Sequence, residues 1–320
     1  MLDGCGRQID HLRLSLTDYC NLACRYCAPE AGHPDCQVID SDLAFAIVRW
    51  LSDAHGISHV RLTGGEPLLY PGLIPLIERL RGLRSLRQLT LTTNGQMLAR
   101  MAGLLADAGL SRINISLDTL DPKRYEHLTR GGKIERTLSG IKAAVRAGLT
   151  PVKINIVAQR GLNDHELADM AEWGLRHECI VRFLEVMPIG PLAHMVDQHL
   201  VGQSEILDRL SERFDLRPIA HSVGQPATDY AAAGQGLHGV VGIIAPMTHP
   251  FCSRCRRLRV TSGGWLVACL HDKTRFPLTQ WWDGQQLDAE GADVTLRQAV
   301  AGKRLIGPQN QSSTMLALGG

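Results

Sequence analysis

The stretch of sequence that decides the fold is LRLSLTDYCNLACRYC, residues 12–27. It begins with an apolar run typical of a buried β-strand, residues 12–16. Three cysteines follow directly in a Cys-x3-Cys-x2-Cys pattern, namely Cys20, Cys24 and Cys27. The sequence therefore predicts a strand whose carboxyl end leads into a loop with three thiols.

Outward from this stretch, strand-like runs alternate with amphipathic helical stretches as far as residue 190. The predicted strands are residues 12–16, 59–63, 88–93, 112–117, 152–157 and 181–186. The predicted helices are residues 42–55, 97–108, 134–147 and 164–177. We expect Ser41 and Asn163 to cap two of these helices, because their side chains accept the free N–H groups of a first turn. Gly109 and Gly148 end two others, since glycine permits a left-handed exit.

This alternation predicts a parallel sheet, because parallel strands need right-handed helical crossovers. Six units form either an open doubly wound sheet or an incomplete (βα)6 version of the eight-stranded barrel. Ligands of both folds collect at the carboxyl ends of the strands. Polar motifs stand at four of these ends, residues 63–67, 92–95, 116–118 and 185–188. We expect them to form one rim.

Composition limits the classes of function. Hydrophobic residues make up 44% of the 320 residues and charged residues 21%, values typical of a folded globular protein rather than a disordered one. The net charge of +2 is too small to attract a polyanion by itself, so we expect no nucleic-acid partner. We find neither a secretory h-region nor an apolar run that would span a bilayer. These features predict a cytoplasmic protein without a membrane partner.

The pattern changes after Pro188, where Gly- and Pro-rich stretches begin. One helical piece is predicted near 204–213, β-like runs at 240–245 and 258–260, and a loop at 231–236. We therefore expect two domains, a partial barrel over 1–190 and a smaller α+β module over 191–320.

The second module carries another cysteine triad, Cys252-x2-Cys255-x13-Cys269. Neither triad has an obvious fourth cysteine, whereas a structural zinc site uses four ligands and a [4Fe–4S] cluster has four irons to ligate. Two clusters, each with one iron free for a small ligand, explain this pattern chemically. One cluster would activate a cofactor and the other would hold a substrate.

Zinc is the alternative metal at both triads. His33 or Cys36 would then be the fourth ligand of the first site, and His249 or His271 that of the second. Cys5, Cys36 and Cys179 belong to no motif, and we interpret them as ordinary thiols.

The motifs resemble those of a known superfamily. The first triad, with Tyr26 before its last cysteine, and the later Gly64-Gly65-Glu66-Pro67 are similar to the signature of radical S-adenosylmethionine (SAM) enzymes. Within that superfamily the chain resembles the GTP 3′,8-cyclase family of molybdenum-cofactor biosynthesis from about Leu12 to Gly320. The resemblance includes residues 12–15, 61–69, 114–118 and 181–188, the second triad and the Gly-Gly terminus.

This resemblance implies a radical SAM barrel with two [4Fe–4S] clusters and SAM as cofactors. Cys20, Cys24 and Cys27 would hold the cluster that activates SAM, and the second triad would hold the other cluster. The positions that match SAM-binding residues are Tyr26, Gly64, Gly65, Glu66, Ser116 and Met187. Packing at the rim is the alternative role of Tyr26 and Met187.

The implied activity is that of a lyase, the first step of molybdopterin cofactor biosynthesis. A 5′-deoxyadenosyl radical abstracts H3′ of GTP, and the C3′ radical attacks C8 to give (8S)-3′,8-cyclo-7,8-dihydroguanosine 5′-triphosphate. The positions that match substrate contacts are Arg13, Arg61, Thr92, Lys153, Arg182, Arg257 and Arg259. Arginine suits a triphosphate because its forked, permanently charged side chain binds phosphate with two donors.

Four residues are the catalytic candidates, Arg257, Arg259, Gly319 and Gly320. The two arginines alternate on a β-like run after Cys255, so they share one face beside the second triad. The resemblance implies that the Gly-Gly terminus enters the cavity between the two clusters.

The chain departs from the family pattern at Tyr19, Ala28, His59 and Tyr70. His59 stands where lysine is common, and Tyr70 stands where basic residues often follow the Gly-Gly-Glu-Pro turn. We expect these two departures to reduce the positive charge near the phosphates.

The resemblance further implies a flavodoxin or ferredoxin as electron donor and a cyclic pyranopterin monophosphate synthase acting on the product, and it allows a homodimer. Two other functions remain open. A radical SAM peptide-modifying enzyme with an auxiliary-cluster domain would share the first triad and the partial barrel. A zinc-stabilised binding protein without catalytic activity would not explain the Gly-Gly-Glu turn.

Overall fold

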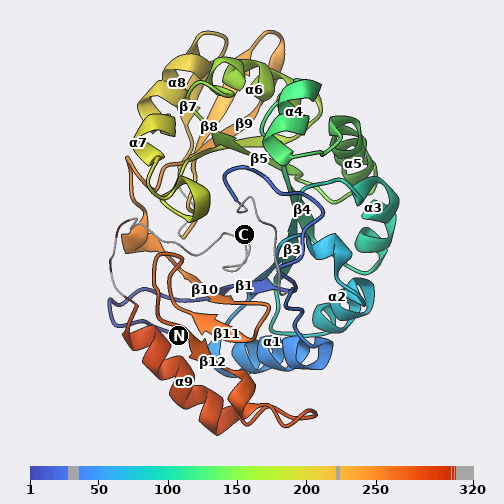
Figure 1. Ribbon diagram of the computed structural model, residues 1–320, viewed down its shortest axis with the longest axis vertical. Helices are drawn as coiled ribbons and strands as arrows, with labels where there is room; N and C mark the ends of the chain where they lie inside the picture. Colours follow the sequence, from blue (N-terminus) through green and yellow to red (C-terminus); the bar gives the residue numbers. More distant parts are fainter. Residues whose placement is uncertain (28–35, 221–223, 304, 306, 308–320) are drawn as a thin grey trace.

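The computed structural model describes residues 1–27, 36–220, 224–303, 305 and 307. Twelve strands form one mixed sheet in the order β12-β11-β10-β1-β2-β3-β4-β5-β6-β9-β8-β7. Every pairing from β10 to β9 is parallel, and the pairings at both ends of the sheet are antiparallel. Within the described residues the sheet is open, because β12 and β7 are edge strands. The helices cover its outer side (Figure 1).

The first half of the chain builds the predicted partial barrel. Its strands are β1 (His11–Ser15), β2 (His59–Thr63), β3 (Gln88–Thr93), β4 (Arg112–Ser116), β5 (Lys153–Ala158) and β6 (Ile180–Glu185). Its helices are α1 (Ser41–His55), α2 (Leu73–Arg81), α3 (Leu98–Asp107), α4 (Pro122–Thr129), α5 (Ile134–Arg146) and α6 (Leu167–Arg176). All six predicted strands are confirmed to within one residue at each end. Two helices, α2 and α4, were missing from the sequence prediction.

Both predicted N-caps are wrong. Asp40, not Ser41, caps α1, and its carboxylate accepts from the backbone N–H groups of Asp42 and Leu43. Asn163 precedes the 3-10 turn at 164–166 but its side chain makes no capping bond, because the Oδ1 that would accept from the first turn accepts from Gln159 N–H (2.7 Å) instead. Its amide N–H groups donate to the carbonyls of Asp118 (2.7 Å) and Val157 (2.9 Å). The helix predicted from 164 therefore begins as a short 3-10 turn and becomes α6 at Leu167.

Residues after β6 extend the sheet at both edges. One edge gains β9 (Leu237–Ile244), β8 (Thr228–Gly234) and β7 (Asp215–Pro218), and the other gains β10 (Arg257–Val260), β11 (Trp265–Val267) and β12 (Phe276–Pro277). Three helices, α7 (Val196–His199), α8 (Gln203–Ser211) and α9 (Ala289–Ala301), belong to the same part. The domain boundary near residue 190 stays a prediction.

The prediction of a loop at 231–236 is wrong, because most of this stretch belongs to β8 and pairs with β9. Its small side chains reflect close packing rather than a turn. A Cβ on Gly234 would lie 2.1 Å from the carbonyl oxygen of Arg213.

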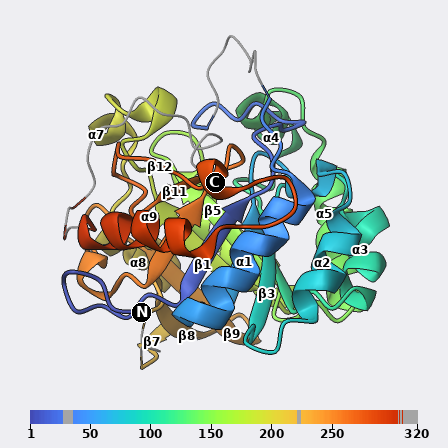
Figure 2. The same cartoon turned by 90° about the horizontal axis from the view of Figure 1, so that it is seen from below.

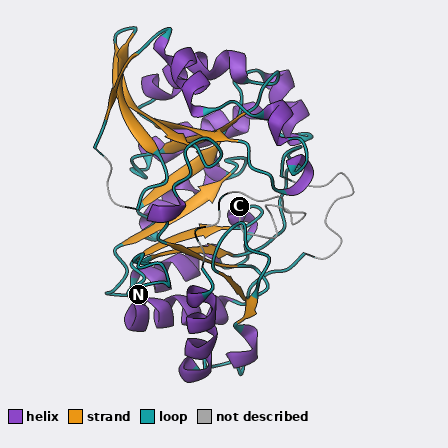
Figure 3. Ribbon diagram, turned by 90° about the vertical axis from the view of Figure 1, so that its left-hand side faces the viewer, coloured by secondary structure: helices purple, strands orange, loops and turns teal. Residues whose placement is uncertain are grey.

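Alternation along the strands separates the core from the site. Leu12, Leu14, Val60 and Leu62 are at most 1% exposed and belong to the core between sheet and helices. The helices lie along one side of the curved strands (Figure 3). Helix α9 lies beside α1 (Figure 2), where Asp293 accepts from the indole of Trp50 (2.9 Å). No helix among the described residues is long and apolar enough to cross a membrane.

Candidate active site

A cavity of about 280 Å³ lies inside the sheet, at the carboxyl ends of β1 to β6. The cysteines that line it are Cys20, Cys24, Cys27, Cys252, Cys255 and Cys269. The two triads are more than 220 residues apart in the sequence, and the parallel pairing of β1 with β10 brings them to one cavity. The strand ends predicted to form one rim contribute Thr63, Thr92, Asn94, Ser116, Asp118, Glu185 and Met187.

The Gly-Gly-Glu turn after β2 holds the first triad's loop in place. Gly65 N–H donates to the carbonyl of Thr17 (2.7 Å), and Glu66 N–H donates to that of Tyr19 (2.8 Å). A Cβ on Gly65 would lie only 2.3 Å from the Tyr19 carbonyl oxygen, so glycine is required for this approach.

Glu66 lies behind this turn and is fully buried. Its carboxylate accepts from the Thr93 hydroxyl (2.7 Å) and from the backbone N–H groups of Asn94 (2.7 Å) and Leu68 (3.0 Å). Burial raises its pKa to about 7. Because it does not line the cavity, this carboxylate positions the ends of β2 and β3 relative to each other.

Tyr26, between the last two cysteines of the first triad, is tied to the end of β4. Its hydroxyl donates to Asp118 Oδ2 (2.9 Å), while Asp118 Oδ1 accepts from Val157 N–H (2.8 Å). Burial raises the pKa of Asp118 to about 6.

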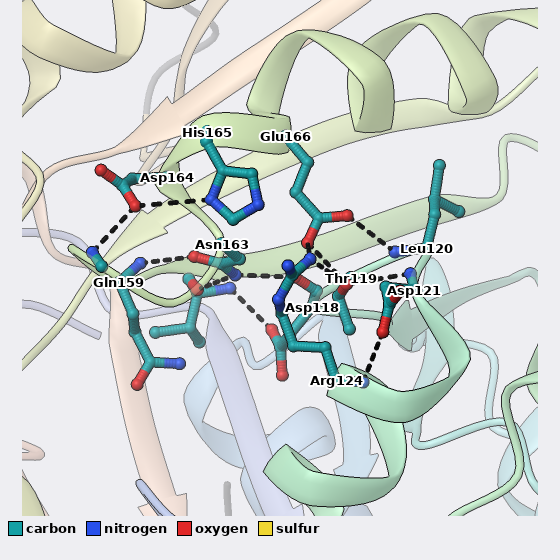
Figure 4. Close-up of polar contacts among 12 residues, drawn as sticks. Asp118, Thr119, Leu120, Asp121, Arg124, Gln159, Asn163, Asp164, His165 and Glu166 are labelled. Carbon is teal, nitrogen blue, oxygen red and sulfur yellow. Dashed lines mark hydrogen bonds and ion pairs between the residues drawn. The ribbon is translucent and has the colours of Figure 1, made fainter.

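Asp118 is itself held by a polar network behind the cavity (Figure 4). Asn163 donates to the Asp118 carbonyl, and it accepts from Gln159 N–H (2.7 Å). Beside it, Glu166 accepts from Thr119 Oγ1 (2.6 Å) and forms an ion pair with Arg124. This network fixes the strand ends against which Tyr26 rests.

Burial keeps the Cys20 and Cys24 thiols protonated when no cation is bound. It raises the pKa of Cys20 to about 11, and it raises the pKa of Cys24 well above the ordinary value, with a further contribution from the Cys27 charge. Thiols ligate metals as thiolates, so binding a metal here releases protons.

The second triad lies in a more positive environment. Burial alone would raise the pKa of Cys255, but Arg257 and Lys303 outweigh it and lower the pKa to about 7. A thiolate is therefore available at this triad near neutral pH.

Two cations from opposite ends of the chain brace this second triad. Arg7 donates to the carbonyls of Cys252 (2.6 Å) and Lys303 (3.0 Å) and pairs with Asp3. Lys303, 2% exposed, donates through Nζ to the carbonyls of Arg257 (2.9 Å) and Ala268. The brace therefore joins both cysteine-bearing segments to the two ends of the chain.

The strand register gathers the arginines. Arg259 of β10 and Arg61 of β2 lie on either side of Arg13 of β1, in the same register. Alternate residues share a face, so these three line the main cavity, together with Arg257 and Thr92. A second cavity of about 110 Å³ is lined by Arg13, Arg61 and Arg257 and by Lys153 and Arg182.

The cations of this set repel one another in a buried space. Burial, then the neighbouring arginines, lower the pKa of Arg61 to about 9 and that of Lys153 to about 7. The same causes lower the pKa of Arg13 well below its ordinary value. Guanidinium groups remain charged at neutral pH despite such shifts. A bound polyanion would relieve this repulsion, so the cavities suit a phosphate-bearing ligand.

Comparisons with known proteins agree with this geometry. A family model described as Radical SAM superfamily matches residues 14–174, and one described as Molybdenum Cofactor Synthesis C matches residues 179–305. The chain is 41% identical over 323 residues to a GTP 3′,8-cyclase of Geobacter sulfurreducens, covering 99% of this chain and 95% of that protein. It is 41% identical over 297 residues to a GTP 3′,8-cyclase of Moorella thermoacetica, covering 91% and 87%. The chain belongs to the GTP 3′,8-cyclase family.

Solved structures support the radical SAM fold of this GTP 3′,8-cyclase family member. Streptococcus suis SuiB bound to S-adenosylmethionine matches with a TM-score of 0.63 at 17% identity, over 87% of this chain and 65% of that one. A methylornithine synthase matches with a TM-score of 0.51 at 18% identity, over 64% and 62%. At these identities the likeness shows the fold alone. The predicted open α/β barrel is confirmed.

The donor set of this GTP 3′,8-cyclase family member fits iron–sulfur clusters better than single zinc ions. One tetrahedral zinc with bonds of about 2.3 Å brings its sulfurs to about 3.8 Å from one another. Among the described residues, neither triad gathers its three sulfurs within 4.8 Å, and adding His249 or His271 gives no such group. The wider spacing of the sulfurs suits a [4Fe–4S] cluster, in which each thiolate binds a different iron.

Most residues of this chain that we predicted to bind the cofactor or the substrate line the two cavities. Tyr26, Gly64, Gly65, Ser116 and Met187 line the main one, and their binding of SAM stays a prediction. Gly319, Gly320, Ala28 and His33 lie outside the described residues. Their roles stay predictions.

The structure corrects one expected effect of the family departures. Tyr70 lines neither cavity; it is 5% exposed and its hydroxyl donates to the carbonyl of Ile39 (2.9 Å). It therefore has a packing role and removes no charge from the phosphate region. His59 does line the second cavity.

Sequence reasoning missed Arg7, Lys303 and the positioning role of Asp118. Asp118 was detectable, since it stands in the polar motif after β4. Arg7 and Lys303 carry no local signal, because only the tertiary fold brings the chain's ends to the second triad.

Proposed function

We propose that this chain converts GTP to (8S)-3′,8-cyclo-7,8-dihydroguanosine 5′-triphosphate in a SAM-dependent radical reaction. One observation carries the proposal: two three-thiol sites face one cavity, and that cavity and the second cavity beside it are together lined by seven arginines and two lysines. Family membership names the reaction, and the cation-rich cavity supplies a place for its triphosphate.

Cys20, Cys24 and Cys27 would hold one [4Fe–4S] cluster, and Cys252, Cys255 and Cys269 the other. When bound, the first cluster and SAM would supply the 5′-deoxyadenosyl radical chemistry that removes H3′ of the nucleotide. Tyr26, Gly65, Ser116 and Met187 line the wall beside the first triad, where they bind SAM and exclude water. Asp118 holds Tyr26 in place through its hydroxyl.

The nucleotide binds between the two triads. Its guanine lies on the side of the second triad, next to Arg257 and Arg259, because the phosphates need the cations of the chamber beyond them. Arg13 and Arg61 line both cavities, so they bind the phosphate chain where it passes from one to the other. Fixing both ends of GTP keeps H3′ a few Å from the reactive carbon of SAM.

A peptide-modifying activity is the second candidate, and the structural likeness to SuiB extends only to fold. The buried cations favour the nucleotide, since a peptide backbone would leave their charges without counter-ions.

Predictions of localisation and partners complete the proposal. All nine cysteines are free thiols, which suits the reducing cytoplasm. The electron donor (flavodoxin or ferredoxin), the synthase that uses the product and a homodimer stay predictions from the family resemblance.

The proposal is tested by anaerobic reconstitution with iron and sulfide, followed by SAM, dithionite and GTP. We expect 5′-deoxyadenosine and a cyclised nucleotide by chromatography and mass analysis. Cys24→Ala should abolish both products, whereas Cys36→Ala, an exposed thiol outside both triads, should form both. Formation of 5′-deoxyadenosine with every nucleotide tested but no cyclised product would overturn the assigned substrate.

A further inference from the structure

The second cavity contains a pair of histidines that the proposed reaction does not use. His11 and His59 are the first residues of β1 and β2, and they lie opposite each other in the parallel register. Their rings stack with centroids 4.3 Å apart and planes 7° from parallel. Both line the second cavity, at the end of the sheet opposite to the cysteine loops.

The second cavity adjoins the main one. Six residues line both cavities: Arg13, Arg61, Asn155, Leu184, Ile244 and Arg257. A ligand with its base at the second triad and its phosphates among these arginines therefore extends toward the histidine pair. The terminal phosphate is then the part of the ligand that lies nearest the histidine pair.

The charges around the pair favour an anion. The basic groups of this cavity come from six strands: Arg13 of β1, Arg61 of β2, Arg112 of β4, Lys153 of β5, Arg182 of β6 and Arg257 of β10. Within the described residues, the Nε atoms of Arg112 and Arg182 are buried without a hydrogen-bond partner. Donors left in this state require an acceptor, and phosphate oxygens supply several.

Two carboxylates near this cavity are already engaged. Asp229 Oδ2 pairs with Arg182 (3.5 Å). Asp10 Oδ1 lies 2.5 Å from His11 Nδ1, and its other oxygen pairs with Arg256. In the part of the chain that the structure describes, His59 has no carboxylate in hydrogen-bond contact; its Nδ1 lies 3.0 Å from Ser58 Oγ. Asp10 therefore orients His11, and His59 is the member of the pair free to respond to a ligand.

A metal ion explains these groups less well. Asp10, His11 and His59 bring three donor atoms within 4.8 Å of one another. Parallel stacked imidazoles, however, direct their in-plane lone pairs side by side rather than toward one point. Arg256 and Arg112 would also repel a cation at this place.

We propose that the stacked pair His11–His59 binds the terminal phosphate of the nucleotide and takes up one proton when it does so. This inference rests on the proposed function. In this chain an imidazole that titrates near neutral pH stands where family members commonly have lysine, so nucleotide affinity becomes pH-dependent.

The direction of the effect follows from the charges that face the pair. Burial lowers the pKa of both rings, and for His59 the charges of Arg112, Arg256 and Arg87 lower it further against the opposing effect of Asp10. The empty site therefore holds neutral rings at pH 7. A phosphate dianion raises the pKa of the pair, so protons are taken up on binding and affinity increases as pH falls. Two imidazolium rings with centroids 4.3 Å apart would repel each other, so the pair takes up one proton rather than two.

The test is equilibrium binding of GTP and GMP to the anaerobically reconstituted protein between pH 6.5 and 8.5. His59→Gln removes the titrating group and His59→Lys makes its charge permanent. His165→Gln, at an exposed histidine in the turn before α6, is the matched control. Because phosphate itself titrates near pH 6, each variant is compared with wild type at the same pH.

We expect wild type to bind GTP about 10- to 100-fold more tightly than His59→Gln at pH 6.5, the range of one charge-assisted contact. At pH 8.5 the two should agree within about threefold, since the ring is neutral there. His59→Lys should bind GTP tightly at both pH values, and GMP affinity should not change in any variant.

Two results overturn the inference while leaving the proposed function intact. One is equal GTP affinity of wild type and His59→Gln across the pH range. The other is loss of GTP binding in wild type on addition of EDTA, which would assign the pair to a metal. Absence of GTP binding in all proteins, with SAM still bound, would instead refute the proposed function.

Discussion

Gly65→Ala tests how the Gly-Gly-Glu turn supports the first triad. The added methyl group would lie 2.3 Å from the Tyr19 carbonyl oxygen and 2.6 Å from that of Asp18. Both are backbone atoms, so no side chain can move aside. Ordinary contact begins near 3.4 Å, so the turn and the cysteine loop must separate by about 1 Å. That separation weakens the hydrogen bonds from Gly65 to Thr17 and from Glu66 to Tyr19.

The expected cost is about 3–5 kcal/mol in the free energy of unfolding, from about 1–3 kcal/mol for overpacking and about 1 kcal/mol for each of the two weakened hydrogen bonds. Urea denaturation measures it, and iron analysis after reconstitution should show loss of about four irons per chain. Gly103→Ala is the control, because this exposed glycine of α3 has open space around its Cβ position. Wild-type stability together with a full iron content in Gly65→Ala would refute the reasoning.

Three further substitutions test other parts of the site. Lys303→Met removes the donor to the carbonyls of Arg257 and Ala268 and should lower the iron held by the second triad. Iron and sulfide analysis of the double variant with Cys24→Ala measures this loss, because only the second triad can then hold a cluster. Arg257→Ala and Arg259→Ala should leave both clusters intact but uncouple 5′-deoxyadenosine from the cyclised nucleotide; full cyclisation would make them a solvated strand face. Asp118→Asn keeps both hydrogen-bond partners and should remove a pH-dependent component of stability. Because the native carboxyl holds its proton more tightly (pKa about 6) than the unfolded one (3.8), wild type loses up to about 3 kcal/mol as pH rises from 4 to 7. The Asp118→Asn variant should not lose this stability, and urea titrations of both proteins at pH 4 and pH 7 measure the difference. An identical loss of stability in wild type and variant would contradict the prediction.

The barrel strands were predictable because their information is local. Apolar residues such as Leu12 and Val60 face the helices, and polar motifs follow four of the six strands. The cysteine triads were equally visible as spaced motifs. Sequence reasoning failed where a side chain has two possible partners: asparagine is a good helix cap, but the Oδ1 of Asn163 accepts from Gln159 N–H rather than from the first turn of the helix.

The parts that escaped prediction depend on contacts between distant segments. Strand β8 looks like an Ala- and Gly-rich loop until β9 pairs with it. Arg7 and Lys303 are almost 300 residues apart, and only the fold places them together at the second triad. The stacking of His11 on His59 likewise follows from the register of β1 and β2.

The central claim is that this cavity directs a SAM-derived radical to C3′ of GTP. The most direct measurement uses GTP deuterated at C3′, with the reconstituted protein, SAM and dithionite under anaerobic conditions. We predict one deuterium in the 5′-deoxyadenosine and none at C3′ of the cyclised nucleotide. Unlabelled 5′-deoxyadenosine, with deuterium retained in the nucleotide, would contradict the account.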